Sequence, residues 1–548
     1  MSGGEAMLRA VLANGVDTVF GLPGVQTYPL YDALKRHENQ VRSVHARHEL
    51  SAAYMAYGYA KSSGRPGVFS VVPGPGMLNA SGALCTAWGA NAPVMLLTGQ
   101  VPSEYFGRGR GHLHELPDQL ATLRSIVKWA GRAQTAGEAP GLVNEAFRHM
   151  LSGRQGPVAL EMCWDVMAGE GTVPADGFSP ASPDAPPEVD GDQIAAAAAI
   201  LAEARAPMIM VGGGAQHAAA EVLELAELLG APVASFRAGR GIVSEGHELG
   251  INCVAAHDLW GETDALIAIG SRCELQYMRW TGMMRLVDRP QAPPHLIRID
   301  IDPAEMTRLK AHAPVLADAA AGTKALIARL GAKGTGATER RDRIAEAKRA
   351  AAAKAAEIQP HAGYLAAIRD VLPDDGFLVE EICQAGFTSL FAFPVYRPRS
   401  FVTGGFQGAL GFGFPAALGV KTAHPEKAVV SITGDGGFLF SAGELASAAQ
   451  QNIAVVTVLF NNGAFGNVRR DQQRLYDGRV IGSDLANPDF LKLAESFGVA
   501  AMRTDTPEGL KGALEKALAL KAPALIELKV DGEKECSPWP LLMPAPGR

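Results

Sequence analysis

The segment from residue 428 to residue 462 constrains the fold of this chain most. Its first part, residues 428–433, is an apolar run typical of a buried strand, and it leads into Gly434-Asp435-Gly436-Gly437. A second apolar run, residues 453–460, leads into Asn461-Asn462. Residues 441–451 between them have the pattern of a helix. The segment therefore predicts a strand–helix–strand unit of a parallel sheet.

Asp435 and Asn462 then leave the carboxyl ends of two strands, where open α/β sheets bind their ligands. Carboxylate and amide oxygens suit a hard cation such as Mg²⁺, which often shares its coordination sphere with a diphosphate. The flanking glycines let the backbone approach phosphate oxygens closely. A Gly-Asp-Gly turn alone is weak evidence, but the paired strand ends predict a site for a metal and a diphosphate.

The same alternation of apolar runs and helical stretches extends along the 548 residues, a length that predicts three or four domains. It is typical of parallel sheets covered on both faces, so the predicted fold class is α/β with three doubly wound parallel-sheet domains. Segments rich in Pro, Gly and Ser, or in Ala, Lys and Arg, separate the units. The predicted boundaries are 1–165, 193–330 and 360–535 for the domains, 166–192 for a linker, 331–359 for a connector and 536–548 for a C-terminal tail.

The composition argues against several classes of function. The formal net charge of −7 is small for this length, and there is no basic stripe with interleaved aromatic residues, so neither nucleic acid nor a membrane surface is an expected partner. No apolar run approaches the roughly 20 residues of a membrane span. The six cysteines are scattered without a Cys-x-x-Cys pair, which is typical of a reducing compartment. A cytoplasmic enzyme is therefore predicted.

The spacing of Asp435 and Asn462 resembles the thiamine-diphosphate signature of the acetolactate synthase and 2-oxo acid decarboxylase superfamily, which includes pyruvate oxidase-like enzymes. The resemblance implies that the three units are a pyrimidine-binding, a central and a diphosphate-binding domain. It also implies thiamine diphosphate and Mg²⁺ as cofactors. The implied metal ligands are the side chains of Asp435 and Asn462 and the backbone carbonyl of Ala464, and the cofactor contacts beside them are Gly434, Gly436, Gly437 and Phe465.

Glu49 stands at the start of a predicted helix, directly after His48. A carboxylate in the first turn of a helix is often explained by the helix dipole alone. Residues 47–60 as a whole, however, resemble the catalytic glutamate helix of the superfamily. There the glutamate hydrogen-bonds the pyrimidine ring of the cofactor and shares a proton with it, so Glu49 is the predicted catalytic acid and base.

Several other positions resemble cofactor-facing loops of the superfamily. Leu410 occupies the place of a bulky apolar side chain that bends the cofactor, and the carbonyl of Gly408 would accept from the cofactor's amino group. A single Leu could equally belong to the core, but the glycines around it favour close approach to a ligand. The remaining predicted contacts are Pro23 and Gly24 after one strand, Asn79 after another, and Gln384 near the diphosphate.

His112 and His114 lie in a polar loop, where histidines are usually just solvated. The same segment falls where members of the superfamily place residues that face the reactive carbon. A histidine there could move protons near neutral pH. His114 aligns best, beside Glu115, and is the second predicted catalytic residue; a short insertion leaves His112 as the alternative.

The resemblance implies an enzyme that decarboxylates a 2-oxo acid, or a related small carbonyl substrate, and then releases or transfers the acyl-carbanion fragment. Two departures argue against a biosynthetic acetolactate synthase. Gln276 replaces an Arg that binds the second keto acid, and Asp471 replaces a substrate-selecting Trp. Either Arg279, Arg469 or Arg470 supplies the lost charge, or the acceptor has no carboxylate.

A run of three glycines, Gly212-Gly213-Gly214, follows an apolar run in the central unit. As a dinucleotide site it is weak, because the Gly-x-Gly-x-x-Gly register fails at Gln216-His217. The stretch that holds FAD in the superfamily is replaced by Ile251-Asn252-Cys253. FAD is therefore a disfavoured cofactor.

The resemblance also implies a homodimer or homotetramer, in which the domain bearing Glu49 in one subunit meets the diphosphate-binding domain of another. Two other functions are left open. One is a thiamine-diphosphate-dependent lyase or hydrolase acting on a 2-hydroxy ketone or diketone. The other is a catalytically dead regulatory homologue, against which the intact Glu49, Asp435 and Asn462 argue.

Overall fold

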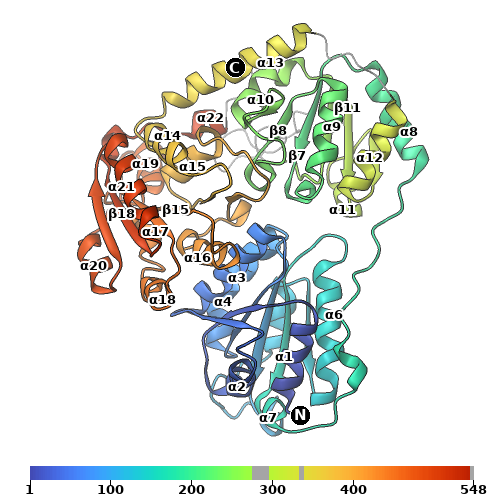
Figure 1. The fold of residues 1–548 in the computed structure, drawn as a ribbon, viewed down its shortest axis with the longest axis vertical. Helices are drawn as coiled ribbons and strands as arrows, with labels where there is room; N and C mark the ends of the chain where they lie inside the picture. Colours follow the sequence, from blue (N-terminus) through green and yellow to red (C-terminus); the bar gives the residue numbers. More distant parts are fainter. Residues whose placement is uncertain (274–294, 332–337, 544–548) are drawn as a thin grey trace.

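The computed structural model describes residues 1–273, 295–331 and 338–543 of the chain. The described residues form three six-stranded sheets with flanking helices (Figure 1). Neighbouring strands run parallel in every sheet. This confirms the predicted fold class, three doubly wound α/β units.

The first sheet has the strand order β2-β1-β3-β4-β6-β5. Its strands are β1 (Thr18–Gly21), β2 (Arg42–His45), β3 (Gly67–Val71), β4 (Val94–Gln100), β5 (Trp129–Ala133) and β6 (Val158–Cys163). The accompanying helices are α1 (Gly3–Ala13), α2 (Tyr28–Arg36), α3 (Glu49–Ser63), α4 (Pro75–Gly89), α5 (Gln119–Ile126), α6 (Ala139–Leu151) and α7 (Trp164–Ala168). β3 and β4 are buried at every position, as expected of strands covered on both faces.

The central sheet has the order β12-β11-β10-β7-β8-β9. Strands β7 to β9 are therefore added toward one edge of the sheet, and strands β10 to β12 toward the other edge. Its strands are β7 (Pro207–Val211), β8 (Val233–Ser235), β9 (Gly250–Ile251), β10 (Ala265–Ile269), β11 (His295–Asp300) and β12 (Ala313–Leu316). The helices are α8 (Gly191–Glu203), α9 (Ala219–Leu229), α10 (Cys253–Leu259), α11 (Pro303–Arg308) and α12 (Ala319–Leu330), followed by α13 (Thr338–Ala356) in the predicted connector.

The third sheet has the order β14-β13-β15-β16-β18-β17. Its strands are β13 (Phe377–Val379), β14 (Phe401–Val402), β15 (Val429–Gly434), β16 (Val456–Asn461), β17 (Ala500–Thr504) and β18 (Ala524–Lys529). The helices are α14 (His361–Val371), α15 (Gln384–Ala392), α16 (Gly413–Ala423), α17 (Asp435–Phe438), α18 (Glu444–Gln450), α19 (Gly466–Leu475), α20 (Phe490–Ser496), α21 (Pro507–Ala519) and α22 (Trp539–Leu542).

The crossover after β15 differs from its prediction. One helix was expected over residues 441–451, whereas the structure has two short helices, α17 and α18, separated by a turn. Asp435 is therefore the first residue of a helical turn that begins where the strand ends. This places its side chain directly at the carboxyl edge of the sheet.

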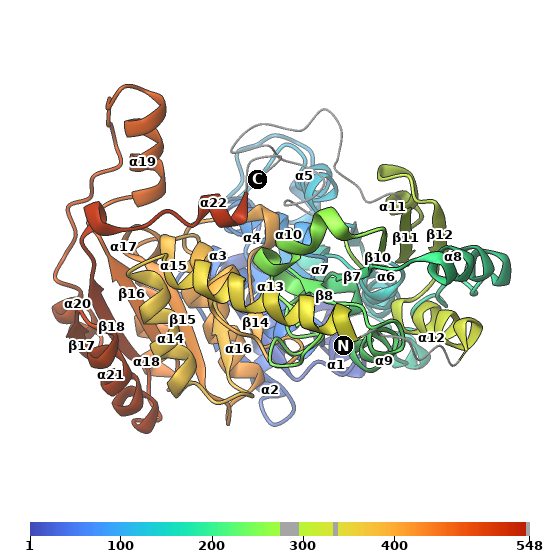
Figure 2. The same cartoon turned by 90° about the horizontal axis from the view of Figure 1, so that it is seen from above.

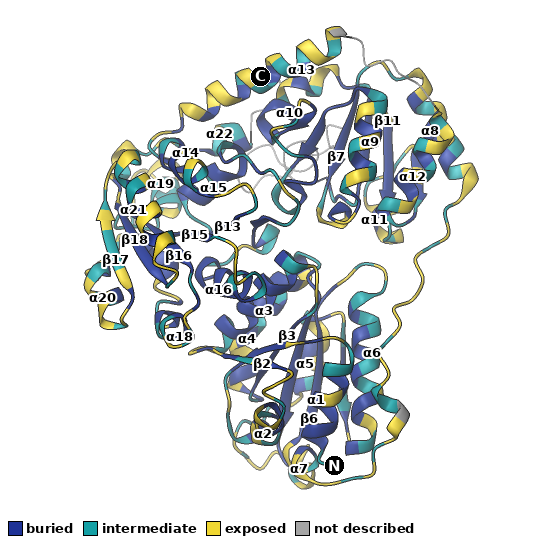
Figure 3. Ribbon diagram, in the orientation of Figure 1, coloured by how far each residue is buried: buried dark blue, intermediate teal, exposed yellow. Residues whose placement is uncertain are grey.

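The first and third sheets have the same topology. Numbered from the start of each sheet, both have the order 2-1-3-4-6-5, whereas the central sheet has the order 6-5-4-1-2-3. Their two helices α3 and α16 pack against each other, and a single buried core includes residues of both domains (Figure 3). Tyr54 and Tyr57 on α3 both contact the ring of Phe412, with ring centroids 5.3 and 5.4 Å apart.

Glycines allow α3 and α16 to cross with their backbones in contact. A Cβ atom added at Gly58 would lie 2.0 Å from the carbonyl oxygen of Ala416. A Cβ atom added at Gly419 would lie 1.9 Å from the carbonyl oxygen of Met55. Each helix thus has a notch that holds the backbone of the other, and no side chain fits in either notch without moving a helix.

Gly58→Ala is therefore expected to destabilise the protein by about 2 kcal/mol, in the range found for extra carbon atoms in packed interiors. Gly512 on α21 provides a matched control, because an added Cβ has nothing within 4 Å there. Gly512→Ala should be neutral or stabilise by up to about 1 kcal/mol through helix propensity. Thermal unfolding of both variants beside wild type measures the difference, and equal unfolding temperatures for the two variants would contradict the close crossing.

None of the helices in the described ranges combines the length and apolar character that crossing a lipid bilayer requires.

Candidate active site

The carboxyl ends of β15 and β16 bring Asp435 beside the Asn462 loop. The two strands pair in parallel up to Gly434 and Phe460, so the loops that follow them start at the same level. Asp435 is buried, and its Oδ2 accepts hydrogen bonds from the backbone N–H of Gly463 at 2.8 Å and from Nδ2 of Asn487 at 2.7 Å. Burial raises the pKa of Asp435, while these donors favour its charged form.

Asn462 is fixed at both ends of its amide group. Its Oδ1 accepts from the N–H of Ala464 at 3.1 Å, and its Nδ2 donates to Oε2 of Glu535 at 3.0 Å. The structure therefore brings together the three predicted metal ligands, Asp435, Asn462 and Ala464, on two adjacent loops. Oxygen donors of this kind fit Mg²⁺.

Asn487 is a site residue that the sequence analysis missed. Besides Asp435, its Nδ2 donates to Oδ1 of Asn461 at 3.1 Å. Its own Oδ1 is buried and has no hydrogen-bond partner among the described residues. No spacing rule connects Asn487 with Asp435, because the intervening chain passes through β16 and α19 before it returns.

Gln384 gives the clearest sign of a missing ligand. It is the first residue of α15, directly after the loop that follows β13, and its side chain is buried. Neither its Nε2 nor its Oε1 has a hydrogen-bond partner within the ranges that the structure describes. Since buried amide groups are nearly always paired, this side chain fits a polar group of a bound molecule. The predicted role at the diphosphate agrees with this chemistry.

Two of the glycines around Asp435 also make room for neighbouring protein groups. A Cβ atom at Gly436 would lie 2.4 Å from the ring of Phe465, and one at Gly437 would lie 2.4 Å from Oε1 of Glu381. Their missing side chains therefore make room for protein groups. Gly434 is less crowded, with its nearest neighbour, Cβ of Cys383, at 3.1 Å from such an atom.

Glu381 is a second residue that the sequence analysis missed. It is buried after β13, and its carboxylate accepts from the N–H of Gly411 at 2.5 Å, the N–H of Gly413 at 3.2 Å and the hydroxyl of Thr433 at 2.7 Å. Burial raises its pKa to about 7. Glu381 thus ties the loop that contains Gly408 and Leu410 to β15, the strand that ends at Asp435. The only signal of Glu381 in the sequence is the acidic pair Glu380-Glu381, which directly follows the apolar run at 377–379.

Glu49 is the first residue of α3, and the third domain holds this end of the helix. The buried carboxylate of Glu444 on α18 accepts from the backbone N–H groups of Arg47 and His48 at 2.9 and 3.0 Å. His48 caps the helix by accepting from the N–H of Leu50. The side chain of Glu49 is partly exposed, and its Oε2 accepts from Nδ2 of Asn79 at 3.1 Å. The structure therefore brings Asn79 and Glu49, two predicted site residues, into contact.

His114 lies near enough to Glu49 for their charges to interact. Burial lowers its pKa, and the negative charge of Glu49 opposes that shift. Its Nδ1 lies 2.9 Å from Oε1 of the buried Gln26, so the ring is oriented by a second side chain. His112 is placed differently, because its ring stacks on Tyr105 with centroids 5.2 Å apart. Of the two alternatives, the geometry favours His114.

The loop after β1 and the loop after β3 meet beside Glu49 and His114. A Cβ atom at Gly24, which follows Pro23, would lie 2.3 Å from Cγ1 of Val72. Gly74 has a φ of 62°, and a Cβ atom there would lie 2.6 Å from the carbonyl oxygen of His114. Both positions require glycine for close packing of loop on loop.

The predicted site residues of the first domain do not bond to those of the third domain within one chain. No hydrogen bond or ion pair among the described residues joins Glu49, Asn79 or His114 to Asp435 or Asn462. Large apolar side chains next to both groups are exposed to solvent: Leu113 is 55% exposed and Phe440 is 57% exposed. The helix α19, which follows the Asn462 loop, projects from the body of the molecule (Figure 2).

The charged positions considered for substrate binding have different surroundings. Arg469 pairs with Asp484 and Glu533, both at 2.8 Å. Arg470 lies 4.0 Å from Glu535, and its Nη1 is buried without a hydrogen-bond partner in the described part of the chain. Gln276 and Arg279 lie outside the described residues. Burial raises the pKa of Asp471.

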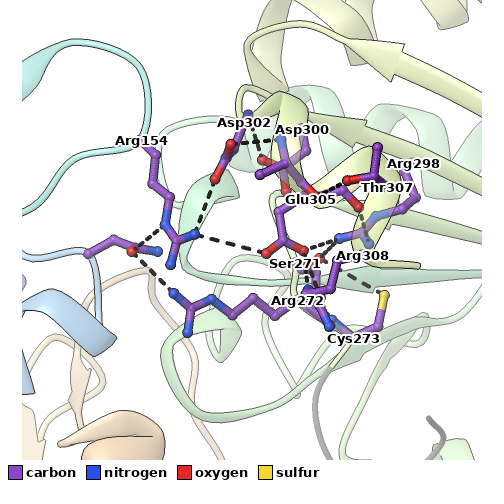
Figure 4. Close-up of polar contacts among 12 residues, drawn as sticks. Arg154, Ser271, Arg272, Cys273, Arg298, Asp300, Asp302, Glu305, Thr307 and Arg308 are labelled. Carbon is purple, nitrogen blue, oxygen red and sulfur yellow. Dashed lines mark hydrogen bonds and ion pairs between the residues drawn. The ribbon is translucent and has the colours of Figure 1, made fainter. Parts of the chain in front are cut away.

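A pocket beside β7 and β10, where the strand order reverses, is lined by residues of all three domains, among them Asn91, Ser271 and Phe406. Figure 4 shows the polar network beside it. Asn91 of the first domain accepts from Arg154 at 2.8 Å and from Arg272 at 3.5 Å. This network ties the first domain to the central one.

The sequence disfavours FAD as a cofactor, and this stays a prediction.

Three models of the thiamine pyrophosphate enzyme family match the chain. The N-terminal TPP binding domain matches residues 1–122, the central domain 194–326 and the C-terminal TPP binding domain 382–528. A probable acetolactate synthase large subunit of Methanocaldococcus jannaschii is 35% identical, over 97% of this chain and 92% of the relative. A probable 2-ketoarginine decarboxylase of Pseudomonas aeruginosa is 33% identical, over 96% of this chain and 94% of the relative.

A solved structure has the same arrangement of domains. It is the thiamine diphosphate-dependent 4-hydroxybenzoylformate decarboxylase of Rhodococcus jostii RHA1, which superimposes with a TM-score of 0.83 at 25% sequence identity. The superposition covers 97% of this chain and 99% of that structure.

Proposed function

Because the chain belongs to the thiamine pyrophosphate enzyme family, among acetolactate synthases and decarboxylases, we propose that it decarboxylates a 2-oxo acid with thiamine diphosphate and Mg²⁺. The resulting acyl fragment is released or transferred to a second carbonyl compound. The observation that supports this most is the position of Asp435 and Asn462 after two paired strands, with the unpaired amide of Gln384 following Cys383, which lies against Gly434.

The residues present fit both parts of the cofactor complex. Asp435, Asn462 and the carbonyl of Ala464 would hold Mg²⁺, and Gln384 would contact the diphosphate. Leu410 and the carbonyl of Gly408 would support the cofactor ring. When bound, thiamine diphosphate supplies an electron sink for the carbanion that remains when a 2-oxo acid loses carbon dioxide.

The protein's own part is to position groups and to move protons. Glu49 would hold a proton at its carboxylate and exchange it with the pyrimidine ring. His114, oriented by Gln26, would donate or accept a proton at its free ring nitrogen, Nε2. The negative charge of Glu49 favours the protonated form of His114.

We further propose that the active unit is at least a homodimer. Within the described ranges no hydrogen bond or ion pair joins Glu49 to Asp435, and the exposed apolar side chains Leu113 and Phe440 lie beside the two parts of the proposed site. A second copy that covers Leu113 and Phe440 would bury these side chains and place Glu49 of one subunit over the metal site of the other.

The substrate class is tested with a panel of 2-oxo acids that includes pyruvate, 2-ketoarginine and 4-hydroxybenzoylformate. The purified protein with thiamine diphosphate and Mg²⁺ should release carbon dioxide from at least one of them. Removal of the metal with EDTA should abolish the release, and added Mg²⁺ should restore it. Aldehyde formation would indicate simple release, whereas a hydroxy ketone product would indicate transfer. Failure to decarboxylate any 2-oxo acid would contradict the proposal and favour a lyase or hydrolase.

A further inference from the structure

The C-terminal segment packs against the metal site. After η9 (Gly532–Lys534), the N–H of Cys536 donates to the carbonyl of Gln359 at 2.9 Å, and Nε1 of Trp539 donates to Asn467 on α19 at 2.6 Å. The ring of Trp539 lies 4.8 Å from that of Phe387 on α15. The described part of the predicted tail is therefore an integral part of the third domain.

Glu535, at the start of this segment, touches a predicted metal ligand. Its side chain is only 3% exposed. Oε2 accepts from Nδ2 of Asn462 at 3.0 Å, and Oε1 lies 2.9 Å from Nε2 of His361, the fully buried first residue of α14. Arg470 lies 4.0 Å from Oε2. Both carboxylate oxygens are thus engaged by protein groups.

The chemistry of these groups determines which way Asn462 points. An Asn side chain has a donating and an accepting end of nearly the same shape, and only the accepting oxygen can bind a cation. A carboxylate accepts hydrogen bonds but donates none. Glu535 therefore stabilises the rotamer in which Nδ2 faces the C-terminal segment and Oδ1 faces the N–H of Ala464. If the amide turned over, two acceptors would meet and the N–H₂ group would face the cation.

We propose that Glu535, held by His361, is a positioning residue that orients Asn462 for magnesium binding. The proposal rests on the proposed function, because it takes Asn462 as a magnesium ligand. Residues that hydrogen-bond to a metal ligand, without touching the metal themselves, typically contribute 10- to 100-fold in metal affinity. Glu535 would do so from a segment that lies 73 residues further along the chain than Asn462.

The isosteric variant Glu535→Gln tests this directly. With Nε2 of His361 still donating to the oxygen of the new amide, its N–H₂ group would face Asn462 and favour the turned-over rotamer. Glu535→Ala removes the acceptor altogether. Glu533→Gln is the matched control, because Glu533 is 74% exposed and pairs with Arg469 on the surface.

Calorimetry on metal-free protein, with Mg²⁺ titrated at a fixed concentration of thiamine diphosphate, gives the half-saturating Mg²⁺ concentration. Both Glu535 variants should raise this value by about 10- to 100-fold. Glu533→Gln should leave it unchanged. At saturating Mg²⁺ the affinity for thiamine diphosphate should return to that of wild type in all variants, which a general folding defect would not allow.

Two outcomes would overturn the proposal, and they differ from failure of the proposed function. A wild-type value in either folded Glu535 variant, or a loss that saturating Mg²⁺ does not restore, would show that Glu535 does not orient a magnesium ligand. Cofactor uptake by wild type that needs no divalent cation would instead contradict the metal site itself. If Glu535→Ala does not fold, Glu535→Gln, which preserves the side-chain volume, decides the matter.

Discussion

Glu49→Gln is expected to lower kcat for carbon dioxide release by about 10²- to 10⁴-fold, the usual contribution of a positioned general acid or base. Gln keeps an oxygen that can accept from Asn79, as Glu49 does at 3.1 Å, so the helix end should stay in place. It cannot, however, hold and return a proton. Steady-state rates with a 2-oxo acid substrate measure the effect.

Binding of thiamine diphosphate and Mg²⁺ to Glu49→Gln should remain within a few-fold of wild type, because the metal ligands are untouched. The exposed Glu38, which pairs only with Lys35 in the described structure, provides a control of the same chemistry in the same domain. Glu38→Gln should be fully active. Full activity in Glu49→Gln would show that the proton is handled elsewhere.

The second large effect is expected at Asp435. Asp435→Asn should weaken magnesium-dependent cofactor binding by more than about 100-fold, because even residues behind the metal ligands contribute up to that amount. The new N–H₂ group would also confront the donors of Gly463 and Asn487 that now bind the carboxylate. Calorimetry of cofactor uptake measures the loss, with the exposed Asp370→Asn as control. Tight binding in Asp435→Asn would exclude Asp435 as a metal ligand.

The two variants together test assembly. If each active site uses Glu49 of one subunit and Asp435 of the other, a mixed dimer has one site with both defects and one intact site. Co-expression of the two inactive variants in equal amounts should then restore about a quarter of wild-type activity, since half the dimers are mixed. If each site lay within one chain, every site would stay defective and no activity would return.

The fold was largely predictable because buried parallel strands are continuous apolar runs. The run at 428–433 predicted β15 (Val429–Gly434) to within one residue, and the run at 453–460 covers all but the last residue of β16 (Val456–Asn461) but begins three residues too early. The edge strands β14 and β17 gave no such signal. β14 has two residues, and β17 is exposed or half-buried throughout, so neither produces an apolar run.

The candidate site was predictable only where its residues stand in runs that resemble motifs of the superfamily. Asp435, Asn462 and Glu49 stand in such places. Glu381 and Glu535 do not, because their roles come from contacts with distant segments: Glu381 with the N–H groups of a loop 30 residues away, and Glu535 with an amide 73 residues away. Side-chain contacts across such separations depend on tertiary packing, which no local pattern contains.

The mutual notches at Gly58 and Gly419 have a mechanical consequence. Neither domain can slide past the other along α3 and α16 unless a helix moves. Under the proposed function, Glu49 and Asp435 of one subunit are therefore carried by a single rigid block, which would meet a second subunit as one surface.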